Sequence, residues 1–305
     1  MEPSTDQAGP SGAWEAPYLP DAAGYWTVPI AGQQRLARDT YRLDIDLPPL
    51  ARRIVPGQFI MLRLAGANDP LLGRAFALYD VTSTGDGESP SRVSIVYQVK
   101  GKLTRRLAAA APGQTIALWG PLGNGFPIPD DPGTVVLVAG GIGFTPFLAL
   151  ARELLHHQHY GINPPRHQAA RRVVFCYGAR SQAFLVGVDT FRQLGVDLHV
   201  ATDDGSAGYH GRVTDLLREI LQSADVPVDL IVTCGPDVMM AIVAQIAQRA
   251  GLPCQVSLET PMACGIGACF SCVAKVRQAD GTWDYKRTCV EGPVFDARRI
   301  VWNGE

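Results

Sequence analysis

Four cysteines near the carboxyl end place the strongest constraint on how this chain folds. Cys264, Cys269, Cys272 and Cys289 follow the spacing C-x4-C-x2-C-x16-C. The first three belong to the run ACGIGACFSC, which has the ligand spacing of plant-type [2Fe–2S] proteins. Because four thiolates must converge on two irons, the loop has to curl tightly, and the two glycines within the run permit the backbone angles that this needs. The spacing therefore predicts a [2Fe–2S] cluster held by these four side chains.

A structural zinc site is the main alternative for the same cysteines. Zinc sites usually pair two short C-x2–4-C units, whereas Cys289 has no nearby cysteine partner. The other three cysteines, Cys176, Cys234 and Cys254, are scattered along the chain. In a chain without an export signal, clustered cysteines favour metal binding over disulfides. An iron–sulfur cluster is thus the favoured interpretation, with zinc and unligated thiols as the alternatives.

Composition limits the class of protein. A chain of 305 residues is expected to form two or three domains, and a formal charge of −2 without a basic block makes nucleic acid and anionic membranes unexpected partners. Residues 1–24 lack the basic start and apolar run of a signal peptide, so we expect a disordered tail. The long apolar stretch Val135–Ala151 is interrupted by Gly and Pro, which favours a strand and a helix over a membrane span. The expected location is therefore the cytoplasm.

The first large part of the chain has the pattern of an antiparallel β-barrel. Short apolar segments are evenly separated by Gly, Pro and Asp turns, without helical periodicity. The predicted strands are Gln58–Leu64, Arg74–Asp80, Arg92–Val99 and Thr115–Trp119, with an earlier strand near Thr40–Leu47. We predict a barrel domain over residues 25–128.

The pattern then changes to alternating strands and helices. Wholly apolar strands separated by helical segments are typical of a parallel sheet covered on both faces, which predicts an α/β domain over residues 129–252. The remaining residues, 253–305, form the predicted cluster domain, so the predicted fold is multi-domain, α/β and β. The predicted strands are Val135–Ala139, Arg172–Tyr177, Asp197–Ala201 and Asp229–Thr233; helices are expected from about Pro146 and over Asp237–Arg249, and a hairpin over Val273–Gln278 and Thr282–Cys289.

A glycine-rich segment, GGIGFTP, follows the first of these apolar strands and opens a helix. Gly140, Gly141 and Gly143 would let the backbone approach a pyrophosphate, and the amino end of the helix favours negative charge. The pattern G-x-G-x-x-P differs from the usual dinucleotide fingerprint. A plain strand-to-helix turn is therefore the alternative.

Three weaker signals point to nucleotide and flavin binding. TDDGSAGYHG, from residue 202, could line a dinucleotide cleft or form an ordinary turn. Cys234 begins a helix, where a thiol can face a reactive ring or simply fill the core. Arg74 opens an apolar strand and could pair with a flavin pyrophosphate, with Tyr79 or Tyr97 stacking on a ring; a surface arginine and core aromatics are the alternative.

Taken together and in this order, these motifs resemble the ferredoxin–NADP reductase superfamily. MACGIGACFSC followed by YKRTCVEGPVFDA is similar to the electron transfer subunits of class 1B, NAD-linked dihydroorotate dehydrogenases, and the resemblance runs from about Trp26 to the end of the chain. It implies FAD between the barrel and the α/β domain. The implied flavin positions are Arg74, Ala75, Phe76, Ala77, Val96, Tyr97, Gln98, Leu103 and Thr104. Ala75, Ala77 and Leu103 depart from the Pro, Ser and Gly of the family, so we expect the details of FAD binding to differ.

The resemblance also implies an electron path. NAD(H) would bind near Gly140–Thr145 and near Asp203, Gly205 and Cys234, and Thr145 itself would be one of the binding residues. FAD and the cluster would then link NAD(H) to FMN in a partner catalytic subunit that oxidises dihydroorotate to orotate for pyrimidine biosynthesis, in a complex with two copies of each subunit. No side chain of this chain is expected to act as a catalytic acid or base. The preference for NADH or NADPH stays open.

Two other functions remain as alternatives. The chain could be the FAD and iron–sulfur reductase of another redox complex, serving an oxygenase, a hydrogenase or a sulfur reductase. It could also be a non-enzymatic regulatory subunit that lacks FAD, an idea prompted by the departures at Ala77 and Leu103.

Overall fold

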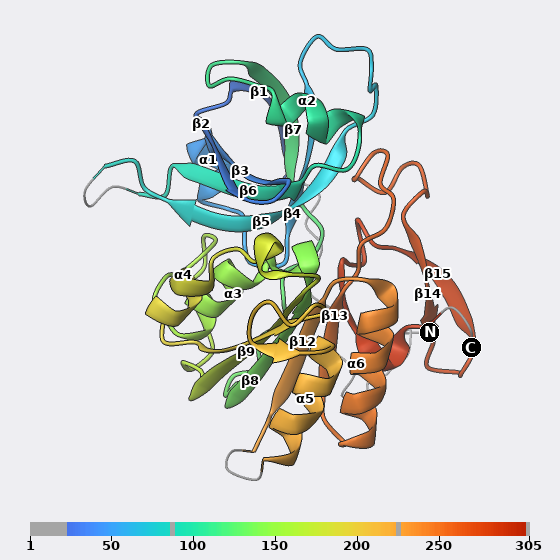
Figure 1. Ribbon diagram of the computed structural model, residues 1–305. Coiled ribbons are helices and arrows are strands. Elements are labelled where there is room, and N and C mark those ends of the chain that lie inside the picture. Colours follow the sequence, from blue (N-terminus) through green and yellow to red (C-terminus); the bar gives the residue numbers. More distant parts are fainter. Residues whose placement is uncertain (1–22, 86–88, 224–226, 303–305) are drawn as a thin grey trace, which may run out of the picture.

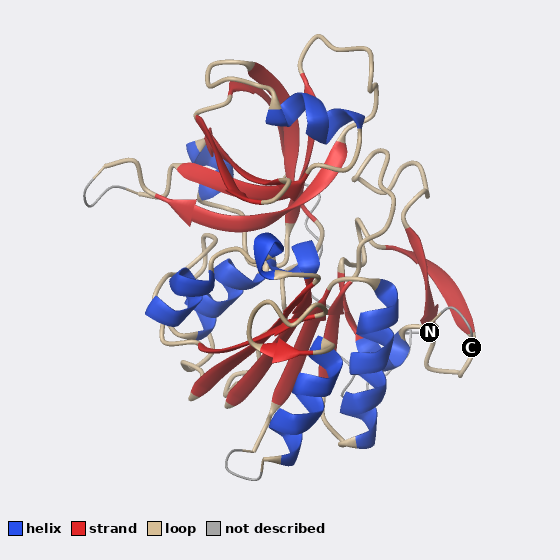
Figure 2. Cartoon of the chain, in the orientation of Figure 1, coloured by secondary structure: helices blue, strands red, loops and turns tan. Residues whose placement is uncertain are grey.

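Two seven-stranded sheets and a two-stranded hairpin make up the fold in the computed structural model, which describes residues 23–85, 89–223 and 227–302. Figure 1 shows the first sheet above the second, with the hairpin beside them, and Figure 2 shows the helices gathered mainly on the second sheet. The predicted tail of residues 1–24 lies almost entirely outside the described residues, and the first strand begins at Gly24.

The first sheet is antiparallel and curls into the predicted barrel. Its strand order is β1-β7-β4-β5-β6-β3-β2. Alternating side chains such as Leu62, Ile95 and Leu118 are fully buried inside it, which is the pattern expected of a small closed sheet. All five predicted strands are confirmed. The strands are β1 Gly24–Pro29, β2 Gly32–Ala37, β3 Thr40–Asp46, β4 Phe59–Leu64, β5 Arg74–Thr82, β6 Arg92–Gln98 and β7 Thr115–Leu122, and the helices are α1 Pro48–Ala51 and α2 Lys102–Ala108.

The second sheet is the predicted parallel sheet. Its order is β11-β10-β9-β8-β12-β13-β16, and β16 alone runs antiparallel to its described neighbour. Helices α3 and α4 cover one face, where Phe147 and Phe191 are buried, and α5 and α6 cover the other, where Leu217 and Met240 are buried. The strands are β8 Thr134–Gly140, β9 Arg172–Ala179, β10 Asp197–Thr202, β11 Tyr209–His210, β12 Leu230–Cys234, β13 Cys254–Ser257 and β16 Val294–Asp296; the helices are α3 Phe147–Leu154, α4 Val188–Gln193, α5 Val213–Gln222 and α6 Asp237–Arg249.

The cysteine-rich segment is folded against both sheets. The predicted hairpin is confirmed as β14 Val273–Arg277 and β15 Trp283–Arg287. Residues 253–305 also supply β13 and β16 to the parallel sheet, so this part of the chain is not a separate layer. Cys272 and Cys289 pack with side chains of barrel strands β4 and β7 in one buried cluster. The cysteine loop therefore lies directly on the barrel.

An ion pair between a buried carboxylate and a half-buried arginine joins the barrel to helix α3 on the parallel sheet. Asp80 of β5 lies 2.8 Å from Nη1 of Arg152 on α3, and the hydroxyl of Tyr160 donates to Asp80 at 2.9 Å. Gln158 donates to the carbonyl of Val81 at 2.7 Å. These contacts hold α3 and the segment after it against barrel strand β5.

Among the described residues, none of the helices has both the length and the apolar character that crossing a membrane requires. The apolar stretch Val135–Ala151 is instead divided between β8, a 3₁₀ turn over Gly141–Phe144 and α3. The predicted interpretation as a strand followed by a helix is confirmed.

Candidate functional site

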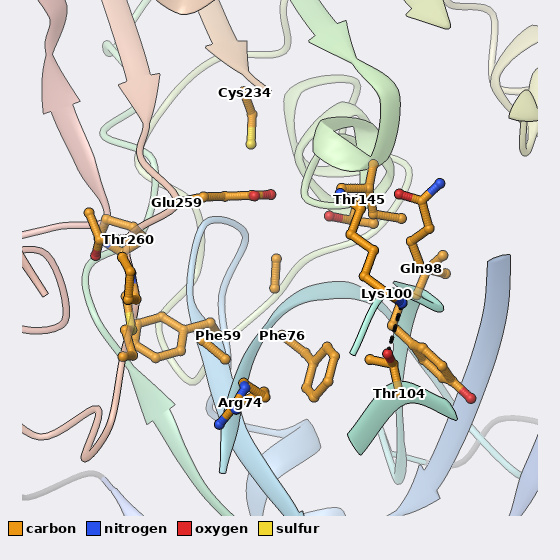
Figure 3. Close-up of a pocket in the computed structure, with 18 of the residues that line it drawn as sticks. Phe59, Arg74, Phe76, Gln98, Lys100, Thr104, Thr145, Cys234, Glu259 and Thr260 are labelled. Atoms are coloured by element: carbon orange, nitrogen blue, oxygen red, sulfur yellow. Dashed lines mark hydrogen bonds between the residues drawn. The ribbon is translucent and has the colours of Figure 1, made fainter. Parts of the chain in front are cut away.

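A pocket of about 460 Å³ lies between the barrel and the parallel sheet. Strands β5 and β6 and helix α2 form its barrel side, while Thr145, Cys234 and Glu259 approach it from the parallel sheet, as Figure 3 shows. Its size is within the range of small-molecule and cofactor sites. The pocket is therefore the candidate flavin site.

The structure brings all nine predicted flavin positions to this pocket. They are Arg74, Ala75, Phe76, Ala77, Val96, Tyr97, Gln98, Leu103 and Thr104. They meet because β5 and β6 are adjacent in the barrel and α2 follows directly after β6. Three consecutive elements thus bring their motifs to one cavity.

The lining suits a flat ring joined to phosphate. Phe59, Phe76 and Leu103 supply apolar surface, and Arg74 and Lys100 bring positive charge. The guanidinium of Arg74 donates to the carbonyls of Leu72 and Gly73 at 3.1 and 2.9 Å. These bonds orient the side chain while only part of its donor set is used, and an arginine held in this way can bind phosphate oxygens.

Helix α2 explains how Leu103 is accommodated at a position where the family has glycine. Leu103 lies in the first turn of α2 and is 2 % exposed, so this position needs no positive φ and its side chain fills the barrel core. The hydroxyl of Thr104 accepts hydrogen bonds from the backbone N–H groups of Lys100 and Gly101, each at 3.0 Å. The loop before the helix is therefore held by Thr104, and leucine is accommodated without strain.

Cys234 and Glu259 face the pocket from the parallel sheet. Burial raises the pKa of the Cys234 thiol, with the charge of Glu259 adding to the effect. Glu259 is exposed to solvent, yet most of its carboxyl is surrounded by protein. Loss of solvation raises the pKa of this carboxyl, and the positive charge of Lys100 opposes the rise. Sequence reasoning missed Glu259. Its position directly after a buried strand, at the same sheet edge as Cys234, was the signal that could have identified it.

The glycines of GGIGFTP differ in what their missing side chains allow. A Cβ on Gly143 would lie 2.2 Å from the carbonyl oxygen of Cys234, and one on Gly140 would lie 2.6 Å from Sδ of Met239. Both glycines therefore permit the turn after β8 to pack on the turn after β12. Gly141 has φ +55° and faces open space. Among these three glycines, Gly141 therefore has the surroundings that best allow a ligand to approach. Two other residues of the segment, Ile142 and Thr145, line the pocket.

Asp203 and Gly205 lie at the end of β10 and do not line the pocket. The backbone N–H of Asp203 donates to the carbonyl of Ala179 at 3.1 Å, and Gly205, with φ +72°, sits beside the ring of His210. Parallel strands present their carboxyl ends at one edge of a sheet, which is where nucleotides bind in such folds. These two residues therefore share an edge with Gly141 and Cys234.

The four predicted ligand cysteines come together as two pairs. Sγ of Cys272 lies 3.2 Å from Sγ of Cys289, and Cys269 is hydrogen-bonded to Cys264. A two-iron cluster needs two thiolates at each iron. The donor set therefore fits a [2Fe–2S] cluster.

The two ends of the cysteine set have different surroundings. Hydrogen bonding from Ser271, whose hydroxyl lies 3.1 Å from the sulfur, lowers the pKa of the exposed Cys269 thiol to about 6. Burial raises the pKa of Cys289 to about 12, opposed by a hydrogen bond from the N–H of Gly267. The thiolate is the form that binds metal, and the lowered pKa of Cys269 favours that form at the exposed end of the loop.

Comparison with protein-family models divides the chain into three matched segments. Residues 27–126 match an oxidoreductase FAD-binding domain and residues 137–245 match an oxidoreductase NAD-binding domain. Residues 259–301 match the iron–sulfur cluster binding domain of dihydroorotate dehydrogenase B. The predicted cofactor set of FAD, NAD(H) and an iron–sulfur cluster is thereby confirmed.

Individual relatives point the same way. The electron transfer subunit of dihydroorotate dehydrogenase B (NAD(+)) from Desulforamulus reducens is 34 % identical over 267 residues, covering 88 % of this chain and 94 % of the relative. The subunit of the same name from Bacillus caldolyticus is 35 % identical over 274 residues, covering 89 % and 96 %.

A solved structure extends the likeness to three dimensions. A chain of the NADH-dependent reduced ferredoxin–NADP oxidoreductase is 29 % identical, has a TM-score of 0.74 and covers 90 % of both chains. Sequence and fold thus agree over nearly the whole length, with the cluster-binding domain included. The chain belongs to the family of electron transfer subunits of NAD(+)-linked dihydroorotate dehydrogenase B.

Proposed function

We propose that this chain carries electrons between NAD(H) and an FMN-containing dihydroorotate dehydrogenase catalytic subunit, in a complex with two copies of each. One observation carries the proposal: the pocket and the cysteine loop share barrel strand β4. Phe59 of β4 lines the pocket and also packs with Cys272 and Cys289. A flavin in the pocket and a cluster on the loop would therefore be neighbours.

A bound flavin would supply the chemistry that links a two-electron donor to a one-electron cluster. The residues of this chain would bind the two cofactors and orient them. We propose that Arg74 and Lys100 hold phosphate, that Phe76 and Leu103 exclude water, and that Cys264, Cys269, Cys272 and Cys289 hold the cluster. No acid or base is required of the protein.

For the nucleotide, we propose the carboxyl edge of the parallel sheet. Gly141 offers an open backbone there, and Thr145 and Cys234 would face the nicotinamide from the pocket side. Asp203 and Gly205 would lie toward the adenosine end. The proposed division of the chain is a tail over 1–24, an FAD domain over 25–128, an NAD domain over 129–252 and a cluster domain over 253–305.

Support for a docked partner comes from exposed apolar side chains around the cysteine loop. Ile266 and Phe270 flank the exposed Cys269, and Trp283 and Tyr285 project from the neighbouring hairpin. Grouped exposed apolar residues are typical of interaction sites. A redox partner bound here would lie against the end of the chain where the cluster is expected.

An anaerobic titration of the purified full-length chain with NADH tests the proposal. Flavin absorbance should bleach first, and a paramagnetic signal of a reduced [2Fe–2S] cluster should follow. The chain should reduce artificial acceptors with NADH but turn over dihydroorotate only when the catalytic subunit is added. Zinc or no metal in a well-folded oxygen-free preparation, or rapid dihydroorotate turnover by the chain alone, would contradict it.

The likeness to NADH-dependent reduced ferredoxin–NADP oxidoreductase supports a second candidate, a reductase of another redox complex. The protein that co-purifies with the chain separates the two functions. A catalytic subunit carrying FMN and oxidising dihydroorotate favours the first, whereas a different redox enzyme favours the second.

A further inference from the structure

We infer that Trp119 is a positioning residue that ties the first cluster cysteine to the flavin side of the barrel. Trp119 lies on β7, where it pairs with Met61 of β4 and Tyr25 of β1. Its indole Nε1–H donates to the carbonyl of Cys264 at 2.8 Å. This bond joins residues 145 positions apart, one in the barrel and one in the cysteine loop. The inference rests on the proposed function, because it needs both cofactors.

The far edge of the same indole lies against the backbone of Gly73, the residue before the pocket residue Arg74. A Cβ on Gly73 would lie 2.8 Å from Cη2 of Trp119, so only glycine lets the backbone come this close. The carbonyl of Gly73 accepts a hydrogen bond at 2.9 Å from Arg74, which lines the pocket. One ring therefore contacts the backbone next to a proposed phosphate ligand and the backbone of a proposed iron ligand.

The cysteine loop has little freedom at this point. Gly265 has φ +72°, and a Cβ there would lie 2.5 Å from Cγ of Met61, the strand partner of Trp119. The backbone after Cys264 thus packs closely on Met61 of β4, while the indole of Trp119 hydrogen-bonds to the carbonyl of Cys264. Without the N–H donor, packing would still support the loop, but the orientation of the first ligand would no longer be fixed.

The test removes the donor and keeps the ring. Trp119→Phe and site-specific replacement of Trp119 by benzothienylalanine, which has the shape of tryptophan but no N–H, are compared with Trp302→Phe, at a half-buried tryptophan that packs against the core of the parallel sheet. Measurements on the anaerobic full-length chain are flavin content, the rate of iron loss to a chelator, the paramagnetic spectrum of the reduced cluster and the rate of electron arrival at the cluster after NADH. Loss of one hydrogen bond predicts roughly three- to tenfold faster iron loss, with an altered spectrum and slower electron arrival.

Flavin content should be unchanged in both Trp119 variants, and Trp302→Phe should match wild type in every measurement. If wild type holds FAD and the cluster but the benzothienylalanine variant equals it within about twofold, the inference is overturned while the proposed function stands. Loss of flavin together with iron in that variant would also overturn it, because Trp119 would then be a general packing residue. A wild-type chain without iron or flavin would overturn both.

Discussion

At the scale of single residues, the exposed ligand Cys269 offers the sharpest test of the cluster. Cys269→Ser should remove most of the visible absorbance of the cluster, because a serine oxygen is a harder and less available ligand than a thiolate and three thiolates cannot complete two irons. Cys254→Ala, at a buried position on β13 outside the four-cysteine set, is the matched control and should keep the spectrum. Iron and sulfide analysis of the anaerobic proteins checks the result, and a full wild-type spectrum in Cys269→Ser would remove this residue from the ligand set.

Residue chemistry was predictable from the sequence where a local motif carries it. The cysteine spacing and Arg74 at the start of a strand are local; the structure pairs Cys272 with Cys289 and places Arg74 at the pocket. Glu259 and Lys100 reach the pocket only through tertiary packing. Gly143 belongs to a motif, but its contact with the carbonyl of Cys234 depends on a segment about ninety residues away, which no local pattern shows.

At the scale of elements, the buried pair of Asp80 and Arg152 holds α3 to the barrel. Burial raises the pKa of Asp80, and Arg152 opposes that shift. A raised carboxyl pKa means that the stability contributed by this group is greatest at low pH and falls as pH rises through the folded-state pKa. Arg152→Met removes the opposing charge, so the Asp80 pKa should rise further and the buried carboxylate should become costly near neutral pH.

Arg152→Met should therefore lower the free energy of unfolding by about 3–5 kcal/mol at neutral pH, and by less at pH 5. Urea unfolding at the two pH values measures both quantities. Arg171→Met, at an exposed arginine paired with Asp131 at 3.3 Å, is the control and should cost at most about 1 kcal/mol. An equal loss at both pH values for Arg152→Met would show that the carboxylate of Asp80 is not the group left without a partner.

Long elements with a clear period were predicted well, and short ones were not. Helix α6 covers the predicted range Asp237–Arg249, and each predicted strand has its counterpart. Strand β16 has three residues and β11 has two, too few for a period to appear. Strand β16 is held in place from elsewhere: the side-chain amide of Asn124 donates to the carbonyl of Val294 at 2.9 Å and accepts from its N–H at 3.0 Å. The formation of so short a strand at the edge of the sheet therefore depends on tertiary contacts.

At the scale of the whole molecule, the barrel is the common support for both redox sites. The pocket opens between the barrel and the parallel sheet, and the cysteine loop packs on strands β4 and β7. The ion pair of Asp80 with Arg152 joins the barrel to α3, and the hydrogen bond of Trp119 joins the barrel to the cysteine loop. The sequence predicted three parts in the right order, but it could not predict how they pack, because the contacts between them join residues 72 and 145 positions apart.

This arrangement leaves the cysteine loop facing outward, so a change on its surface should affect the partner and not the cluster. Ile266 is 53 % exposed and lies between two glycines of the loop. Ile266→Glu should weaken association with the catalytic subunit about tenfold or more, because a charge would have to be desolvated in an apolar contact. The visible spectrum and NADH oxidation with artificial acceptors should stay at the wild-type level.

Ile162→Glu, at an isoleucine 74 % exposed in the loop between α3 and β9, is the control and should leave association unchanged. Equal association of both variants, measured by titrating one subunit with the other and following dihydroorotate-dependent NAD⁺ reduction, would place the partner on another face of the molecule.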